Sequence, residues 1–152
     1  MDQAELPPET GKTLNFGELR HRCVGLTAHL RLRGVPVGES VAYAMANGID
    51  TASVIIGSLY GGYLTTAINL VSGKDTIGYV IGHADARIVF MHDKTPGNVA
   101  EAISEQSSAI EQVMIDASWF SSCNCDLEKL NCNQDGLLMY TSGTTGVPKG
   151  VV

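Results

Sequence analysis

The residues best suited to chemistry stand near the carboxyl end of the chain, where glycines and hydroxyls are mixed. The segment 140–149 reads Tyr-Thr-Ser-Gly-Thr-Thr-Gly-Val-Pro-Lys, directly after an apolar run that predicts a buried strand over 137–140. Glycines let main-chain N–H groups approach an anion, hydroxyls add donors that can rotate, and the lysine adds a positive charge for a polyphosphate. The pattern therefore predicts a phosphate-binding loop. Its candidate nucleotide-contacting residues are Thr141, Ser142, Gly143, Thr144, Thr145, Gly146 and Lys149.

This loop differs from the two most common glycine-rich nucleotide motifs. A Walker A loop has Gly-Lys-Ser/Thr after a glycine and four residues, whereas Pro148 stands five residues after Gly143, and Lys149 is followed by Gly150. No G-x-G-x-x-G pattern follows a predicted strand. A nucleotide site at this loop is therefore of another type.

Residues 140–152 resemble the AMP-binding signature of the adenylate-forming enzymes, which include acyl-CoA synthetases, luciferases and the adenylation domains of peptide synthetases. The likeness continues upstream, because residues 14–19 resemble the family's Thr-Tyr-x-Glu-Leu opening. Residues 30–42 resemble its Leu-x-x-x-Gly-Val-x-x-Gly-Asp-x-Val-Ala stretch. Two departures, Glu39 for aspartate and Ala67 for proline, lie outside the nucleotide-contacting positions of the family. The alternative interpretation of the glycine-rich segment is a surface hairpin joining two strands.

The resemblance implies an ATP-dependent acid–thiol ligase. In this family a small-molecule carboxylic acid, with a fatty acid as the favoured class here, attacks the α-phosphate of Mg·ATP to give an acyl-adenylate. Coenzyme A then displaces AMP. The implied cofactors are ATP, Mg²⁺ and coenzyme A, and the loop residues named above match the phosphate contacts, with Lys149 neutralising the departing pyrophosphate. The alternative is a non-catalytic remnant that keeps a phosphate-binding loop without ligase activity.

The resemblance also implies an incomplete enzyme. Family members are longer, and their adenine pocket, acyl pocket, magnesium-binding glutamate and C-terminal lysine follow the signature. We therefore expect the 152 residues to be an N-terminal fragment that is inactive alone and holds neither a catalytic residue nor a metal ligand. The expected organisation is an irregular entry over residues 1–12 and a partial AMP-binding domain over residues 13–152.

Strand and helix patterns alternate along the chain, which predicts an α/β fold with a mainly parallel sheet. Asn15 and Glu18 form a capping-box pattern for a helix that ends at Gly34. Asp50 is a plausible cap for a second helix, whose small residues, among them Gly57, predict close packing of helix on sheet. Strands are expected at 39–45, 64–70, 87–91 and 110–115, and further helices at 51–60, 76–84 and 96–105.

Composition disfavours several function classes. The net charge is −6, and the only basic concentration, at positions 20, 22, 31 and 33, has the helical spacing of a solvated face, which argues against nucleic acid as a partner. The sequence has no apolar run long enough for a transmembrane segment, and its acidic start is unlike a signal peptide, so a cytoplasmic location is expected.

Cysteine and histidine spacing offers little local chemistry. Cys123, Cys125 and Cys132 supply at most three zinc ligands, so we favour free thiols in a variable surface insert. The four histidines stand on separate predicted elements without the companions of a catalytic triad.

Overall fold

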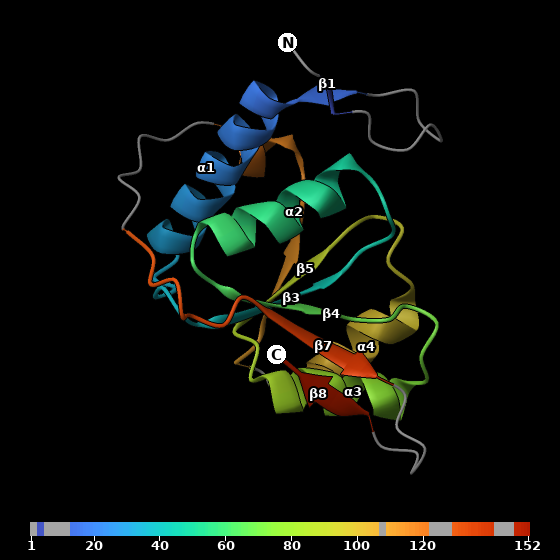
Figure 1. Cartoon of the computed structure of the whole chain (residues 1–152). Helices are drawn as coiled ribbons and strands as arrows, with labels where there is room; N and C mark the ends of the chain where they lie inside the picture. Colours follow the sequence, from blue (N-terminus) through green and yellow to red (C-terminus); the bar gives the residue numbers. More distant parts are fainter. Residues whose placement is uncertain (1–2, 5–12, 107–108, 122–128, 142–147) are drawn as a thin grey trace.

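The computed structural model describes residues 3–4, 13–106, 109–121, 129–141 and 148–152. Helices and strands alternate over most of this part of the chain, as Figure 1 shows. The elements are β1 (Gln3–Ala4), β2 (Leu14–Asn15), α1 (Phe16–Leu32), β3 (Ser40–Ala44), α2 (Ile49–Tyr60), β4 (Leu64–Ala67), α3 (Lys74–Ala84), β5 (Ile88–Met91), α4 (Gly97–Gln106), β6 (Glu111–Met114), the 3₁₀ helix η1 (Ala117–Phe120), β7 (Leu137–Thr141) and β8 (Lys149–Val151).

The main sheet of the described residues has six strands in the order β6-β5-β3-β4-β7-β8. All neighbouring pairs from β6 to β7 are parallel, whereas β7 and β8 are antiparallel. The prediction of an α/β fold with a mainly parallel sheet is therefore confirmed. In such sheets, ligands bind outside the carboxyl ends of the strands, and β7 leads from this edge into the predicted phosphate-binding loop.

Helices cover both faces of the sheet (Figure 1). Val41, Ile88 and Phe90 point to the face where α1, α2 and η1 contribute one hydrophobic cluster. Ala42 and Val89, one residue away on the same strands, point to the opposite face, where α3 and α4 contribute a second cluster. Buried residues on both faces explain why β3 and β5 read as continuous apolar runs rather than as alternating patterns.

The predicted start of the first helix is confirmed, and the predicted cap of the second is wrong. The Glu18 N–H donates to Asn15 Oδ1, and the Asn15 N–H donates to Glu18 Oε2, both at 2.9 Å, which completes the capping box. Helix α2 begins at Ile49 with Gly48 as its N-cap, so Asp50 lies inside the first turn. Its carboxylate accepts a hydrogen bond from the guanidinium of Arg22 on α1 instead.

Gly57 of α2 serves a helix–helix contact rather than the predicted helix–sheet contact. A Cβ added at Gly57 would lie 2.8 Å from Leu26 Cδ2 and 3.3 Å from Cys23 Cα, both on α1. A glycine at this crossing lets the two helices approach more closely than any side chain would allow. Because α1 and α2 cover the same face of the sheet, their mutual contact determines which residues of α2 must be small.

The prediction that the arginines at positions 20, 22, 31 and 33 form a solvated face is correct only in part, because Arg20 and Arg33 are exposed whereas Arg22 and Arg31 are partly buried. The Arg22 guanidinium lies 3.6 Å from the centre of the Phe120 ring, and that of Arg33 lies 4.2 Å from the Trp119 ring. Arg33 Nε also donates to Glu111 Oε1 at 3.2 Å. Helix η1 packs against α1, and its Trp119 and Phe120 belong to the hydrophobic core, whereas Ala117 and Ser118 are exposed. Cys132 is free and exposed as expected, whereas Cys123 and Cys125 lie outside the described residues.

Two other kinds of feature are absent from the described residues. Within the described ranges, no helix combines the length and apolar character that crossing a bilayer requires. The same residues contain no group of three or more histidine, cysteine or acidic side chains that could hold a metal ion.

Candidate functional site

The predicted phosphate-binding loop connects the two strands of a hairpin. β7 and β8 pair in antiparallel fashion, with Met139 opposite Val151, Tyr140 opposite Gly150 and Thr141 opposite Lys149. Directly opposed residues extend their side chains on the same face of a sheet, so Thr141 and Lys149 flank the base of the loop as a cross-strand pair. The other predicted contacts, Ser142, Gly143, Thr144, Thr145 and Gly146, lie outside the described residues.

The hairpin of the alternative interpretation is thus present, and it is compatible with phosphate binding. Successive main-chain N–H groups in a turn can surround an anion whatever elements the turn connects. A hairpin also holds its two strand ends at a short, defined separation. The structure therefore brings together the two described site residues from the two ends of the loop.

The strand before the loop is correctly placed, but the prediction that it is buried is wrong. Only Leu138 is buried in β7, with 8% of its surface exposed, whereas Met139 is 54% exposed. Successive side chains alternate between the two faces of a strand, and α3 lies against only one face of this hairpin. Leu138 and Gly150 are in contact on that face, as a Cβ at Gly150 would lie 3.1 Å from Leu138 Cδ1.

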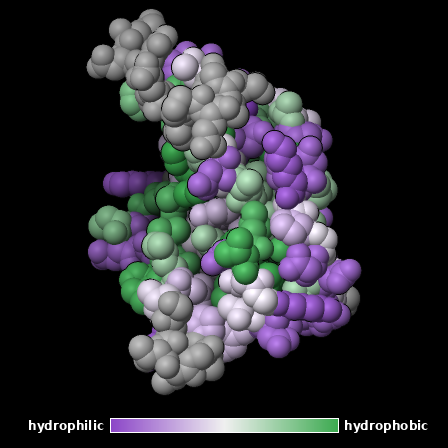
Figure 2. Space-filling view, turned by 90° about the vertical axis from the view of Figure 1, so that its right-hand side faces the viewer, coloured by the Kyte–Doolittle hydropathy of each residue, from purple (hydrophilic) through white to green (hydrophobic). Residues whose placement is uncertain are grey.

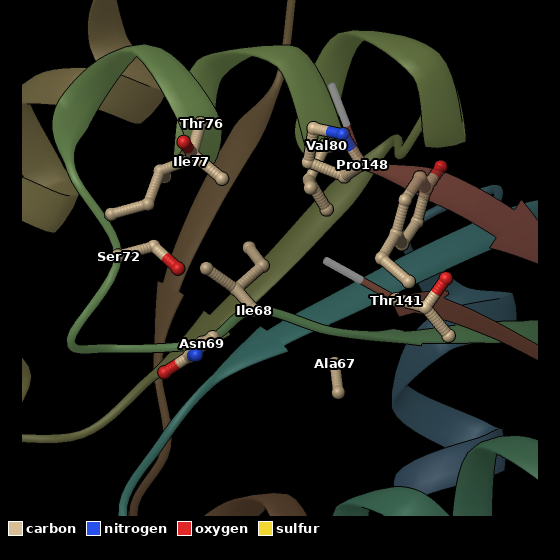
Figure 3. A pocket seen from close by; sticks show the side chains of 10 residues that line it. Ala67, Ile68, Asn69, Ser72, Thr76, Ile77, Val80, Thr141 and Pro148 are labelled. Atoms are coloured by element: carbon tan, nitrogen blue, oxygen red, sulfur yellow. The ribbon is translucent and has the colours of Figure 1, made fainter. Parts of the chain in front are cut away.

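A cavity of about 370 Å³ adjoins the hairpin where β4 and β7 end. In the close view of Figure 3, Ser72, Thr76 and Ile77 lie across the cavity from Thr141. Both described residues that adjoin the undescribed part of the loop, Thr141 and Pro148, line it. The remaining lining residues come from β4, the turn after it, α3 and β7. Among the described residues, the lining is Ala67, Ile68, Asn69, Ser72, Thr76, Ile77, Val80, Tyr140, Thr141 and Pro148.

Our sequence analysis missed most of this lining. The lining residues come from two segments, 67–80 and 140–148, that are far apart in the sequence, and none of them carries a charged side chain that would mark it individually. Only the topology of the sheet could have predicted this lining. Ala67 and Thr141 end two strands that are neighbours in a parallel sheet, so they lie at the same edge. Figure 2 views the molecule from the right-hand side of Figure 1, the side toward which β7 runs. Hydrophobic and hydrophilic residues are both present on this face, so it offers apolar contacts as well as polar ones.

Tyr140, the residue before Thr141, is held by side chains from α3. Its hydroxyl oxygen lies 2.8 Å from His83 Nδ1, within hydrogen-bond distance. Burial, with a smaller contribution from nearby Tyr79, raises the pKa of Tyr140 above its ordinary value. The hydroxyl is therefore neutral near pH 7 and able to donate to an unprotonated imidazole nitrogen.

The other described histidines have different surroundings. His29 Nε2 lies 3.0 Å from the Ser118 carbonyl oxygen, and the His92 imidazole contacts the Asp93 carboxylate. His92 also lines a second cavity, of about 490 Å³, near the start of α2. Of the predicted nucleotide-contacting residues, the two that the structure describes, Thr141 and Lys149, do not line that second cavity.

The chain has relatives of known activity. The family profile described as "AMP-binding enzyme" matches residues 2–152. The chain is 31% identical to sulfoacetate–CoA ligase of Cupriavidus necator, over 97% of this chain and 30% of the relative. It is 30% identical to 4-chlorobenzoate–CoA ligase of an Arthrobacter species, over 98% of this chain and 29% of the relative. It thus spans less than a third of the length of either ligase.

The fold is shared with solved structures. Superposition on the N-terminal domain of FACL13 from Mycobacterium tuberculosis gives a TM-score of 0.83 at 24% identity, covering 99% of this chain and 39% of that one. At this level of identity the likeness shows a common fold.

Proposed function

The chain belongs to the AMP-binding family of adenylate-forming enzymes, and from this premise we propose that it supplies the phosphate-binding loop of an AMP-forming acid–CoA ligase. The complete reaction has two steps. A carboxylate oxygen attacks the α-phosphorus of ATP, the bond to the β-phosphate oxygen breaks, and pyrophosphate leaves. The thiol of coenzyme A then attacks the acyl carbon, loses its proton and displaces AMP.

The observation that carries this proposal is the cross-strand pair of Thr141 and Lys149 at the base of the loop. In the first step, negative charge develops on the departing pyrophosphate, and a nearby ammonium group with hydroxyl donors stabilises that charge. We assign this role to Lys149 and assign phosphate contacts to Thr141 and residues 142–146. Magnesium enters as the Mg·ATP complex, and no described residue is assigned to bind it.

The substrate class and location are part of the same proposal. We favour a fatty or similarly apolar carboxylic acid because residues 57–62 and 67–73 resemble acyl-CoA synthetases more than peptide-synthetase domains. The apolar side chains of Ile68, Ile77 and Val80 beside the loop are compatible with such a substrate. A cytoplasmic location would give the protein access to ATP and coenzyme A.

Calorimetric titration of the chain with Mg·ATP, magnesium pyrophosphate and AMP tests the loop assignment. We expect Mg·ATP and pyrophosphate to compete for one site, and AMP to bind at least about tenfold more weakly, because it lacks the phosphates that the loop contacts. Equal affinity for AMP and Mg·ATP would place the main contacts elsewhere. Absence of binding by all three ligands would contradict the proposal for this chain.

We also expect the 152-residue chain by itself to form no acyl-CoA, since it spans under a third of its ligase relatives. Incubation with Mg·ATP, coenzyme A and a mixture of acetate, octanoate, palmitate and benzoate, followed by chromatography of the thioesters, measures this directly. A time-dependent thioester peak would overturn the expectation. The same assay on the longest protein encoded in frame with these residues separates a ligase from a non-catalytic phosphate-binding protein.

A further inference from the structure

We propose that Tyr79, His83 and Tyr140 form an aromatic clamp that sets the position of the phosphate-binding loop on helix α3. His83 and Tyr79 lie outside the loop, and they act as positioning residues for it through their contacts with Tyr140. The inference rests on the proposed function of the loop and adds two residues that precede it by more than fifty positions.

The three side chains form a continuous series of ring contacts from α3 to β7. The Tyr79 and His83 rings are stacked, with centres 5.6 Å apart and an angle of 29° between their planes. The Tyr140 ring meets His83 edge to face, at 5.6 Å and 87°. The hydrogen bond between His83 Nδ1 and the Tyr140 hydroxyl, at 2.8 Å, adds a directional contact. Stacking resists displacement of the rings, and the hydrogen bond selects one orientation of Tyr140.

The second strand of the hairpin lies against the same rings. Gly150 is the cross-strand partner of Tyr140. A Cβ at this glycine would lie 3.4 Å from Tyr140 Cε1 and 3.5 Å from His83 Cε1. The clamp therefore contacts both strands that lead into the loop, at the pair of residues adjacent to Thr141 and Lys149.

Little else in the described structure holds this end of the hairpin. The pairing of β4 with β7 covers Thr65 with Leu137 and Thr66 with Leu138, and it stops there. From Met139 to Thr141, the strand pairs only with β8, which is an edge strand. The hairpin thus extends beyond the part of the sheet that pairs with β4. Side-chain contacts with α3 determine its angle at the point where the loop begins.

The same helix also lines the cavity beside the loop. Thr76, Ile77 and Val80 lie on α3, one or two turns before His83, and all three line the cavity. Thr76 and Ile77 lie across the cavity from Thr141, and Val80 lies beside Pro148 (Figure 3). A hairpin released from His83 would therefore change both the direction of the loop and the width of the adjoining cavity. This consequence distinguishes a positioning role from simple surface packing.

The test compares variants that remove or retain the hydrogen bond. Tyr140→Phe deletes the hydroxyl and keeps the ring. His83→Phe keeps a stacked ring and loses the nitrogen, whereas His83→Asn restores a hydrogen-bonding atom near the position of Nδ1. Tyr60→Phe, which deletes a tyrosine hydroxyl at the end of α2, is the matched control. Each protein is titrated with Mg·ATP in a calorimeter, and its urea unfolding midpoint is measured in parallel.

We expect Tyr140→Phe and His83→Phe to raise the Mg·ATP dissociation constant about two- to fivefold, as befits the loss of one hydrogen bond near the surface. His83→Asn should recover most of the affinity, and Tyr60→Phe should leave it unchanged. Wild-type affinity in Tyr140→Phe would overturn the proposal. Equal losses in His83→Phe and His83→Asn would also do so, because general packing, rather than the hydrogen bond, would then be responsible.

A ligand-free measurement keeps the clamp separate from the proposed function of the loop. In amide NMR spectra, Tyr140→Phe and His83→Phe should shift Thr141 and Lys149 in the same direction, and His83→Asn should resemble wild type. If wild-type protein fails to bind Mg·ATP but shows this pattern, the clamp stands and the phosphate-binding function fails. Unchanged Thr141 and Lys149 resonances in both ring-retaining variants would overturn the clamp itself.

Discussion

Replacement of Lys149 with alanine is expected to weaken the binding of Mg·ATP by about ten- to a hundredfold. Hydrogen bonds that involve a charged group contribute roughly 1.5–3 kcal/mol, which corresponds to this range of dissociation constants. Lys149 is exposed at the start of β8. It lies directly opposite Thr141, so the two side chains extend from the same face of the hairpin, one at each end of the loop. Calorimetry on Lys149→Ala and wild type measures the effect.

Two controls make this result specific. Lys129→Ala removes an exposed lysine that belongs neither to the hairpin nor to the described lining of the cavity, so it should leave the affinity within about twofold. Lys149→Arg keeps the charge and should recover part of the affinity. Wild-type binding by Lys149→Ala would remove the lysine from the site. An equal loss in Lys129→Ala would indicate only a general effect of net charge.

The dependence on salt gives an independent check on the same residue. If Lys149 contacts the phosphates, raising the salt concentration should weaken Mg·ATP binding by wild type more steeply than by Lys149→Ala. Parallel curves for the two proteins would contradict a direct ionic contact. The comparison needs no assumption about the conformation of residues 142–147.

Local signals in the sequence predicted two of the elements, helix α1 and the strand that leads into the loop. Asn15 and Glu18 are three residues apart and cap a helix through their own backbone groups, so no distant partner is needed to recognise them. The apolar run over 137–140 likewise predicted the strand that leads into the loop. Both features are recognised from residue types that stand within a few positions of one another, although β7 itself pairs with β4 and β8.

Tertiary partners could not be predicted in this way. Asp50 has a good capping side chain, yet helix α2 begins at Ile49, two residues before its predicted start, and the Asp50 carboxylate binds Arg22 on another helix. The hydrogen bond between His83 and Tyr140 joins residues separated by 57 positions. Each residue alone is unremarkable, and only the order of strands in the sheet brings α3 beside β7. Exposure of Met139 has the same origin, because it depends on which face of the hairpin a helix covers.

Trp119 is the clearest residue of this kind, and its replacement with alanine should have the largest effect on stability. It stands in a segment that reads as irregular, yet it is only 5% exposed. Its ring meets Phe90 edge to face at 5.5 Å and lies 5.2 Å from the His29 ring. Removing a buried tryptophan side chain costs roughly 3–5 kcal/mol, so urea denaturation of Trp119→Ala should show a loss of this size.

The controls for Trp119 separate stability from function. Trp119→Phe keeps an aromatic ring and should cost less than the alanine variant, while Phe16→Ala, at a 61% exposed position, should stay within about 0.5 kcal/mol of wild type. Trp119 packs with α1 on the face opposite α3, where the clamp and the cavity lie. Trp119→Phe should therefore lower the unfolding free energy without changing Mg·ATP affinity. Tyr140→Phe, in contrast, should weaken Mg·ATP binding and leave the unfolding free energy close to that of wild type. If the two variants changed both quantities together, the two faces of the sheet would be coupled, and the clamp would not be an independent determinant of loop position.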